Sequence, residues 1–177
     1  MVTGQSRTPI TNQDEGGRNA MTPDLNVPDK IHAVTWHETH RDATDLADRL
    51  ASLGPWRGLV IISRGGLVPG AIVARALGIV CIETVCMTSY KDRVRGPVEI
   101  VKHPPPSLGE GSGWLMIDDL ADTGATADEA RRMLPSAHFA TLYAKPAGRP
   151  FVDTFVREVP QDVWIDFPWD RNPAPSP

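Results

Sequence analysis

The segment WLMIDDLADTGAT (residues 114–126) decides the fold class of this chain. Its first four residues are apolar, as a strand that is buried on both faces requires, and two acids follow directly. A Thr-Gly-Ala-Thr turn then leads into a predicted helix at 126–134, which Pro135 ends. A strand joined to a helix through a short turn is the repeating unit of parallel α/β sheets.

The same alternation extends to both sides of this segment. A Thr35–Glu38 capping box predicts a helix that runs to about Leu50, and a second helix is predicted from Pro69 to Leu77. Apolar and β-branched runs predict four strands, at 58–63, 79–86, 114–117 and 137–144. We therefore expect an α/β fold with a mostly parallel sheet flanked by helices.

Two stretches interrupt the alternation. Residues 87–113 hold Gly96-Pro97 and three consecutive prolines, so we expect a lid or hood loop there. Residues 145–170 hold most of the later aromatic side chains and are expected to form a small C-terminal hood. The polar ends, 1–29 and 172–177, are predicted to be a disordered tail and a flexible tail. One domain at 30–171 remains, with Met1 and Met21 both candidate start sites.

The composition favours a folded protein that acts on small molecules. The 177 residues carry 18 basic and 22 acidic side chains, and the net charge of −4 disfavours nucleic acid as a partner. The first thirty residues lack the apolar core of a signal peptide, so we expect a cytoplasmic protein. Cys81 and Cys86 are predicted to be buried thiols on opposite faces of a strand, which excludes a disulfide between them.

The turn at 123–126 is a candidate anion site, because backbone N–H groups at the start of a helix bind phosphate. Three carboxylates, on Asp118, Asp119 and Asp122, would repel a phosphate placed beside them. Sugar hydroxyls and a Mg²⁺ ion both remove this conflict. A phosphorylated ribose provides the hydroxyls, and its phosphate groups can bind the Mg²⁺ ion. The alternative is that the acids only cap the helix N-terminus.

A second turn, SRGGLVPG at residues 63–70, also joins a predicted strand to a predicted helix. It has neither the lysine of a Walker loop nor the spacing of a dinucleotide fingerprint. Its paired glycines let N–H groups converge on an anion, and Arg64 adds a fork of donors. Two anion-binding turns on neighbouring strands predict a ligand with phosphate at both ends.

Residues 117–126 resemble the phosphoribosyl pyrophosphate (PRPP) signature of type I phosphoribosyltransferases, with Ala125 where that family commonly has glycine. The blocks at 60–70, 143–150 and 159–170 are similar to the xanthine-guanine subfamily, in the same order. The resemblance covers residues 33–170. It implies the type I phosphoribosyltransferase fold, PRPP and a 6-oxopurine base as substrates, Mg²⁺ as cofactor, a homotetramer and a weak peripheral association with the inner membrane.

The resemblance also assigns roles to single residues. Asp122 would be the catalytic base or proton relay at the purine N7, and Asp119 would bind the metal. Lys145 would donate to the 6-oxo group, Trp164 would stack on the ring, and the backbone at Ile165 and Asp166 would read the C2 substituent. The hood cations Arg93 and Arg95 would close over the pyrophosphate. The residues implied to bind PRPP are Arg64, Gly65, Arg95, Asp118, Asp119, Leu120, Ala121, Asp122, Thr123, Gly124, Ala125 and Thr126.

The implied reaction gives GMP, XMP or IMP and pyrophosphate, and the sequence does not rank guanine, xanthine and hypoxanthine. Three alternatives stay open at this point. The chain could be a non-catalytic regulator of the same fold that binds PRPP or a nucleotide, or a pyrimidine phosphoribosyltransferase. Lys145 could be a solvated charge and Trp164 a core aromatic side chain, because late aromatic residues more often pack than bind.

Overall fold

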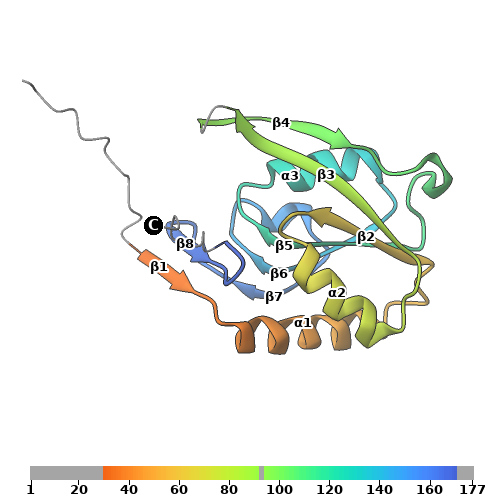
Figure 1. Cartoon of the computed structure of the whole chain (residues 1–177), viewed down its shortest axis with the longest axis horizontal. Helices are drawn as coiled ribbons and strands as arrows, with labels where there is room; N and C mark the ends of the chain where they lie inside the picture. Colours follow the sequence, from red (N-terminus) through yellow and green to blue (C-terminus); the bar gives the residue numbers. More distant parts are fainter. Residues whose placement is uncertain (1–29, 92–93, 171–177) are drawn as a thin grey trace, which may run out of the picture.

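The computed structural model describes residues 30–91 and 94–170. Its central sheet has six strands in the order β4-β3-β2-β5-β6-β7 (Figure 1). Every neighbouring pair is parallel except β3 and β4, which confirms the mostly parallel α/β sheet. The strands are β2 (Gly58–Ser63), β3 (Ile82–Lys91), β4 (Val94–Lys102), β5 (Trp114–Ala121), β6 (His138–Ala144) and β7 (Thr154–Glu158).

Helices cover both faces of this sheet. α1 (Trp36–Ala51) and α2 (Leu67–Leu77) lie along one face, and α3 (Ala125–Met133) lies along the other (Figure 1). Strand residues alternate between the two cores: Leu59 and Ile61 pack with α1 and α2, whereas Val60 and Ile62 pack with α3. Both faces of the central strands are therefore buried, as their continuous apolar runs predicted.

The start of α1 is the capping box that the sequence predicts. The Thr35 hydroxyl accepts a hydrogen bond from the Glu38 N–H at 3.2 Å, and the Thr35 N–H donates to the Glu38 carboxylate at 2.9 Å. Together these contacts satisfy two donors that the first turn of a helix leaves unpaired.

A second, two-stranded parallel sheet pairs β1 (Lys30–Ala33) with β8 (Val163–Asp166), apart from the central sheet (Figure 1). Neither of these strands, nor β7, was expected from the sequence. Each has only four or five residues, and β1 precedes the first strong apolar run. The segment expected as a C-terminal hood contains both β7 and β8. β7 extends the central sheet, whereas β8 belongs to the two-stranded sheet and carries Trp164 and Ile165.

The hood expected at 87–113 is not a loop over most of its length, because it contains strands. Residues 82–91 and 94–102 form the long antiparallel strands β3 and β4, and the short 3-10 helix η1 (Pro106–Leu108) follows them. The prolines and glycine suggested a loop, but β4 is an edge strand, and proline is tolerated where no neighbour needs its N–H. The apolar alternation of Val98, Ile100 and the residues around them was the signal that sequence reasoning overlooked.

The starts of β3 and α2 also differ from the predicted ones. β3 begins at Ile82 rather than Ile79, because the Ile79 N–H still bonds the Ala74 carbonyl at the end of α2. Cys81 consequently lies in the connection and is exposed, so its prediction as a buried thiol is wrong. α2 begins at Leu67, two residues before the predicted start.

The predicted tails at 1–29 and 172–177 lie outside the described residues. Within the described ranges, none of the helices combines the length and apolar character needed to cross a membrane.

Candidate active site

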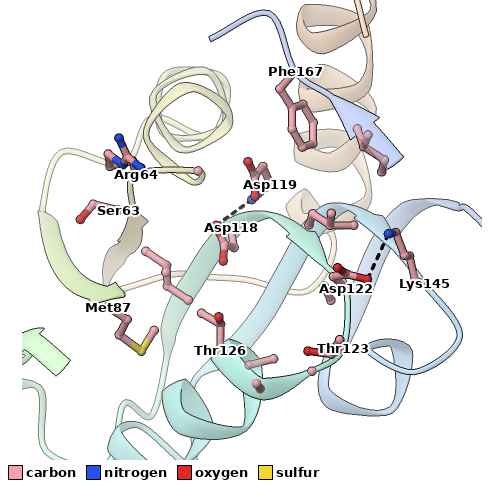
Figure 2. A pocket seen from close by; sticks show the side chains of 18 of the residues that line it. Ser63, Arg64, Met87, Asp118, Asp119, Asp122, Thr123, Thr126, Lys145 and Phe167 are labelled. Carbon is pink, nitrogen blue, oxygen red and sulfur yellow. Dashed lines mark hydrogen bonds and ion pairs between the residues drawn. The ribbon is translucent and has the colours of Figure 1, made fainter. Parts of the chain in front are cut away.

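A cavity of about 610 Å³ opens at the carboxyl ends of the parallel strands, where ligands bind in open α/β sheets (Figure 2). Residues from β2, β3, β5, β6, β8 and the turns after them form its walls. They include almost every predicted site residue with a described side chain: Arg64, Gly65, Asp118, Asp119, Leu120, Ala121, Asp122, Thr123, Gly124, Ala125, Thr126, Lys145, Trp164 and Ile165.

The turn between β5 and α3 is built to present backbone N–H groups. Gly124 has φ +87°, a conformation that favours glycine, and a Cβ at this position would collide with the Phe151 ring. α3 begins at the next residue, and no side chain caps its first N–H groups. Thr123 and Thr126 line the cavity beside these donors (Figure 2). The turn can therefore hold an anion such as a phosphate.

Asp118 and Asp119 lie side by side at the end of β5, and the Asp119 N–H donates to Asp118 Oδ1 at 2.9 Å. Burial, together with the neighbouring Asp119 charge, raises the pKa of Asp118 well above its usual range. Burial and the Asp170 charge raise the pKa of Asp119 to about 6. The pair thus carries unfavourable negative charge that a cation or hydroxyl donors would stabilise.

The second turn, after β2, packs directly against this acid pair. A Cβ on Gly65 would collide with the Asp119 carboxylate, so glycine leaves the space that this side chain occupies. The peptide bond between Ser63 and Arg64 is cis. Ser63, Arg64 and Gly65 all line the cavity, with Arg64 on the opposite side of the acid pair from Asp122 in Figure 2. The prediction that the two turns are neighbours is confirmed.

The other end of the cavity contains a buried ion pair. Lys145 Nζ lies 3.0 Å from Asp122 Oδ1, and the two side chains are 5% and 25% exposed (Figure 2). A Cβ on Gly148 would collide with the carbonyl of Ala121, so the turn that carries Lys145 lies in backbone contact with the turn that carries Asp122. Lys145 is therefore neither solvated nor distant from the acids.

Trp164 and Ile165 bring β8 to this same end. Trp164 is 51% exposed and lines the cavity, so it is not a core aromatic side chain, whereas Ile165 is buried. Asp166 is not among the lining residues, and its carbonyl accepts the Val34 N–H at 2.9 Å in the ladder with β1. An exposed indole face over a cavity is a surface on which a planar ring can stack.

The structure does not describe the side chains of the hood cations Arg93 and Arg95. Only the backbone of Arg95 is described, paired with Tyr90 across the β3–β4 hairpin, and Arg93 lies outside the described residues. Their contact with pyrophosphate stays a prediction.

Sequence reasoning missed several residues around the cavity. Asp170 lines it and acts on Asp119, and its own pKa is raised, mainly by burial. Phe167 lines it, stacked on Trp169 at 4.7 Å. Gln161 lies behind the cavity and donates to Asp122 Oδ1 at 3.0 Å. All three belong to the block 159–170, whose resemblance to the xanthine-guanine subfamily could have pointed to them. Roles were assigned in that block only to Trp164, Ile165 and Asp166.

These side chains give the cavity two chemically distinct ends. One end joins an anion-binding turn, a cationic Arg64 and a pair of carboxylates, which suits a sugar with anionic groups. The other end joins an ammonium, a carboxylate and an exposed indole, which suits a planar heterocycle with hydrogen-bonding edges. The arrangement can bring a sugar phosphate and a heterocyclic base together.

Comparison with known proteins agrees with this geometry. The family model described as the phosphoribosyl transferase domain matches residues 36–174. A xanthine-guanine phosphoribosyltransferase of Nitratidesulfovibrio vulgaris strain Hildenborough is 55% identical over 143 residues, which are 81% of this chain and 86% of that protein.

Solved structures agree at the level of the fold. A purine phosphoribosyltransferase from Pyrococcus horikoshii matches with a TM-score of 0.69 and 23% identity, over 83% of this chain and 99% of that one. The xanthine-guanine-hypoxanthine phosphoribosyltransferase of Helicobacter pylori matches with a TM-score of 0.62 and 22% identity, over 78% and 93% of the two chains. The chain belongs to the phosphoribosyltransferase family and has the type I fold.

Proposed function

We propose that this protein is a purine salvage enzyme of the xanthine-guanine phosphoribosyltransferase type. It transfers the 5-phosphoribosyl group from PRPP to N9 of guanine, xanthine or hypoxanthine and forms GMP, XMP or IMP and pyrophosphate. The observation that carries the proposal is the single cavity in which the sugar-phosphate end and the Asp122–Lys145–Trp164 end meet. The 55% identical relative of that name supports the same activity.

The sugar-phosphate end would hold PRPP along the turn at 118–126. Backbone N–H groups of Thr123 to Thr126 would bind the 5′-phosphate at the N-terminus of α3, with Leu120 and Ala121 forming the wall beside the ribose. The Asp118 and Asp119 carboxylates would accept hydrogen bonds from the ribose hydroxyls. Arg64 and the backbone at Gly65 would bind the pyrophosphate, assisted by Arg95 from the hairpin.

Asp119 and Asp118 fit the chemistry of Mg²⁺. The ion prefers carboxylate oxygens and usually completes its shell with water and substrate phosphates. The described part of the chain has no cluster of three or more potential metal ligands, which suits an ion shared with a substrate rather than enclosed by protein. When bound, Mg²⁺ would neutralise the acid pair and the leaving pyrophosphate.

The base end would select and activate a 6-oxopurine. Lys145 donates but cannot accept a hydrogen bond, so it favours a 6-oxo group over the 6-amino group of adenine. Trp164 would stack on the ring, and the backbone near Ile165 would contact the C2 side. Asp122 would accept the proton from N7, which makes N9 the better nucleophile.

In the reaction, the bond between ribose C1 and the pyrophosphate oxygen breaks and a bond from N9 to C1 forms. The N7 proton passes to Asp122, and the bond electrons leave with pyrophosphate. The C1 centre gains oxocarbenium character, so Arg64 must stabilise the leaving group while the cavity holds both reactants in line. The hairpin of β3 and β4 would act as the hood that excludes water.

The family resemblance extends the proposal to the setting of the enzyme. We propose a cytoplasmic homotetramer that associates weakly with the inner membrane and acts on small molecules, without a nucleic-acid partner. Analytical ultracentrifugation tests the tetramer, and a sedimenting dimer or monomer at micromolar concentration would contradict it. Flotation with anionic vesicles tests the membrane association.

The activity is tested by mixing PRPP and Mg²⁺ with each of the three purines and following nucleotide formation by absorbance. Asp122→Ala should lower kcat/KM by about 100-fold or more, since general acid-base catalysis contributes about 10²–10⁴. Asp128→Asn is the matched control, because Asp128 lies in the first turn of α3, pairs with Arg132 at 2.6 Å and does not line the cavity. Equal rates with wild type and Asp122→Ala would remove Asp122 from the reaction. PRPP binding without any turnover would instead favour the non-catalytic regulator.

A further inference from the structure

Gln161 lies outside the cavity but connects two of its walls. Its Oε1 accepts the Ala147 N–H at 3.0 Å, and its Nε2 donates to Asp122 Oδ1 at 3.0 Å. A backbone N–H can only donate, so the contact with Ala147 determines which end of the amide faces Asp122. The group presented to the Asp122 carboxylate is therefore the NH₂ donor.

The turn that carries Gln161 is anchored on both sides. The Val159 N–H donates to the Ala144 carbonyl at 3.0 Å, at the end of β6. The Val163 N–H closes the turn on the Pro160 carbonyl at 3.2 Å. Gln161 is thus presented by a fixed backbone, although its side chain is exposed.

Asp122 Oδ1 receives two donors from two different segments. Lys145 approaches from the end of β6 at 3.0 Å, and Gln161 approaches from the β7–β8 connection at 3.0 Å. One donor restrains the distance of a carboxylate, whereas two donors on one oxygen also restrain its rotation. Lys145 also has to reach the 6-oxo group of the base, so Gln161 is the donor dedicated to the carboxylate.

We propose that Gln161 is a positioning residue that holds the Asp122 carboxylate in line with the N7 edge of the bound purine. The inference rests on the proposed function, because it requires Asp122 to contact N7. The inference adds a residue that does not itself bind the purine. This side chain, which does not line the cavity, sets the orientation of the catalytic carboxylate.

Two substitutions separate positioning from simple support of the turn. Gln161→Ala removes all of these contacts, including a longer one of 3.5 Å from Nε2 to the Asp122 carbonyl. Gln161→Glu keeps an oxygen that can accept the Ala147 N–H but replaces the donor to Asp122 with a second carboxylate. If Gln161 only supports the backbone at Ala147, the glutamate variant should behave as wild type.

The test uses two purine analogues that differ at position 7. 9-Deazaguanine carries an N7–H that Asp122 can accept, whereas 7-deazaguanine has a C–H there. Each is titrated calorimetrically into enzyme with saturating Mg²⁺ and pyrophosphate, conditions in which no sugar can be transferred. The two analogues also differ at position 9, where 9-deazaguanine has a C–H and 7-deazaguanine an N–H. The change in the ratio of their dissociation constants between a variant and the wild type therefore reports the contact between Asp122 and N7. Both Gln161 variants should reduce this ratio by about fivefold, as expected for one hydrogen bond to a charged group at a partly exposed site.

Turnover gives a second readout. Both variants should lower kcat and raise KM for guanine while KM for PRPP stays within twofold, because the sugar-phosphate end is untouched. Asp162→Asn is the matched control: it removes the exposed Lys30–Asp162 pair of the same turn and should leave the analogue ratio at its wild-type value.

A wild-type ratio in Gln161→Glu, or in both Gln161 variants, would overturn the inference. Asp122→Ala distinguishes this result from a failure of the proposed function. If Asp122→Ala removes the preference for 9-deazaguanine and the Gln161 variants do not, only the role of Gln161 is wrong. If Asp122→Ala keeps the preference, the contact of Asp122 with N7 is wrong, and the inference fails with it.

Discussion

The two ends of the cavity treat negative charge differently. At the sugar-phosphate end, Asp118 and Asp119 lie side by side, and burial raises the pKa of both carboxyls. At the base end, Asp122 is already paired with Lys145 at 3.0 Å and hydrogen bonded by Gln161. One end carries a charge that a bound ligand or cation would stabilise, while the charges of the other end are balanced within the protein.

This difference indicates that the two substrates are bound by different means. A PRPP–Mg²⁺ complex would relieve the repulsion between Asp118 and Asp119, so its binding should stabilise the folded protein strongly. The base end has no comparable repulsion, because Asp122, Lys145 and Gln161 already hold one another in place through ion pairing and hydrogen bonding. Substitutions at the base end should therefore impair purine selection and transfer, whereas substitutions at the acid pair should also change stability.

Among substitutions that leave Asp122 in place, the largest effect is expected from Lys145→Met, which removes the ammonium from the base end. The side chain is 5% exposed, and its loss leaves the Asp122 carboxylate without its cationic partner. The variant also loses the donor to the 6-oxo group. We expect kcat/KM for guanine to fall by about 100-fold, equivalent to about 2.7 kcal/mol of transition-state stabilisation. Steady-state kinetics with guanine and PRPP measure this loss.

The second lysine ion pair near this region provides the control. Lys30 and Asp162 are 2.7 Å apart but 65% and 61% exposed, so Lys30→Met should change kcat/KM by less than about twofold. Similar losses in both lysine variants would show that the burial of the Asp122–Lys145 pair does not matter.

A smaller effect is expected from Gly148→Ala. The added Cβ would collide with the Ala121 carbonyl, so the turn of Lys145 must move away from the turn of Asp122. A displacement of about 1 Å can lower a rate by up to about 100-fold. Because the backbone adjusts and reduces the displacement, we expect kcat/KM for guanine to fall about tenfold. Ala147→Ser, one residue earlier and exposed, should retain wild-type kinetics. An unchanged rate in Gly148→Ala would show that the contact of the two turns is not required.

The sugar-phosphate end could be predicted from the sequence because its signal is local. Residues 114–126 contain a strand, the acids and the start of a helix in one uninterrupted segment, so short-range rules predict their order correctly. The predicted end of the strand at Ile117 is wrong, because β5 runs to Ala121 and includes both acids. The second turn was predictable for the same reason. Its contact with the first turn followed from parallel strands that end at the same edge of the sheet.

The base end was less predictable because distant segments assemble it. Asp122, Lys145 and Trp164 come from three elements, and only the family resemblance connected them. Strand β1, which supports Trp164 through its pairing with β8, is four residues long and has no periodic signal. The β3–β4 hairpin was missed because proline and glycine were given more weight than apolar alternation on an edge strand.

The smallest effect is expected on the stability of Asp119→Asn. This variant tests most directly whether the two ends of the cavity differ in how they balance negative charge. The folded protein raises the pKa of Asp119 from 3.8 to about 6. Between these values the folded chain binds more protons than the unfolded chain, so stability falls as the pH rises and the loss is complete above pH 6. Asparagine carries no charge and escapes this loss.

At pH 7.5 without ligands, Asp119→Asn should therefore be more stable than wild type by about 1 kcal/mol, after allowance for solvent screening, or about 2–4 °C in Tm. At pH 5 the difference should shrink. Addition of Mg²⁺ and PRPP should reverse it, because the variant has lost one of the two carboxylates that fit the cation. Thermal unfolding followed by circular dichroism measures all three conditions. Asp45→Asn, at an exposed pair with Arg49, should show none of these changes. A variant less stable than wild type at pH 7.5 would mean that the acid pair is already stabilised by the protein, and the two ends would not differ as described.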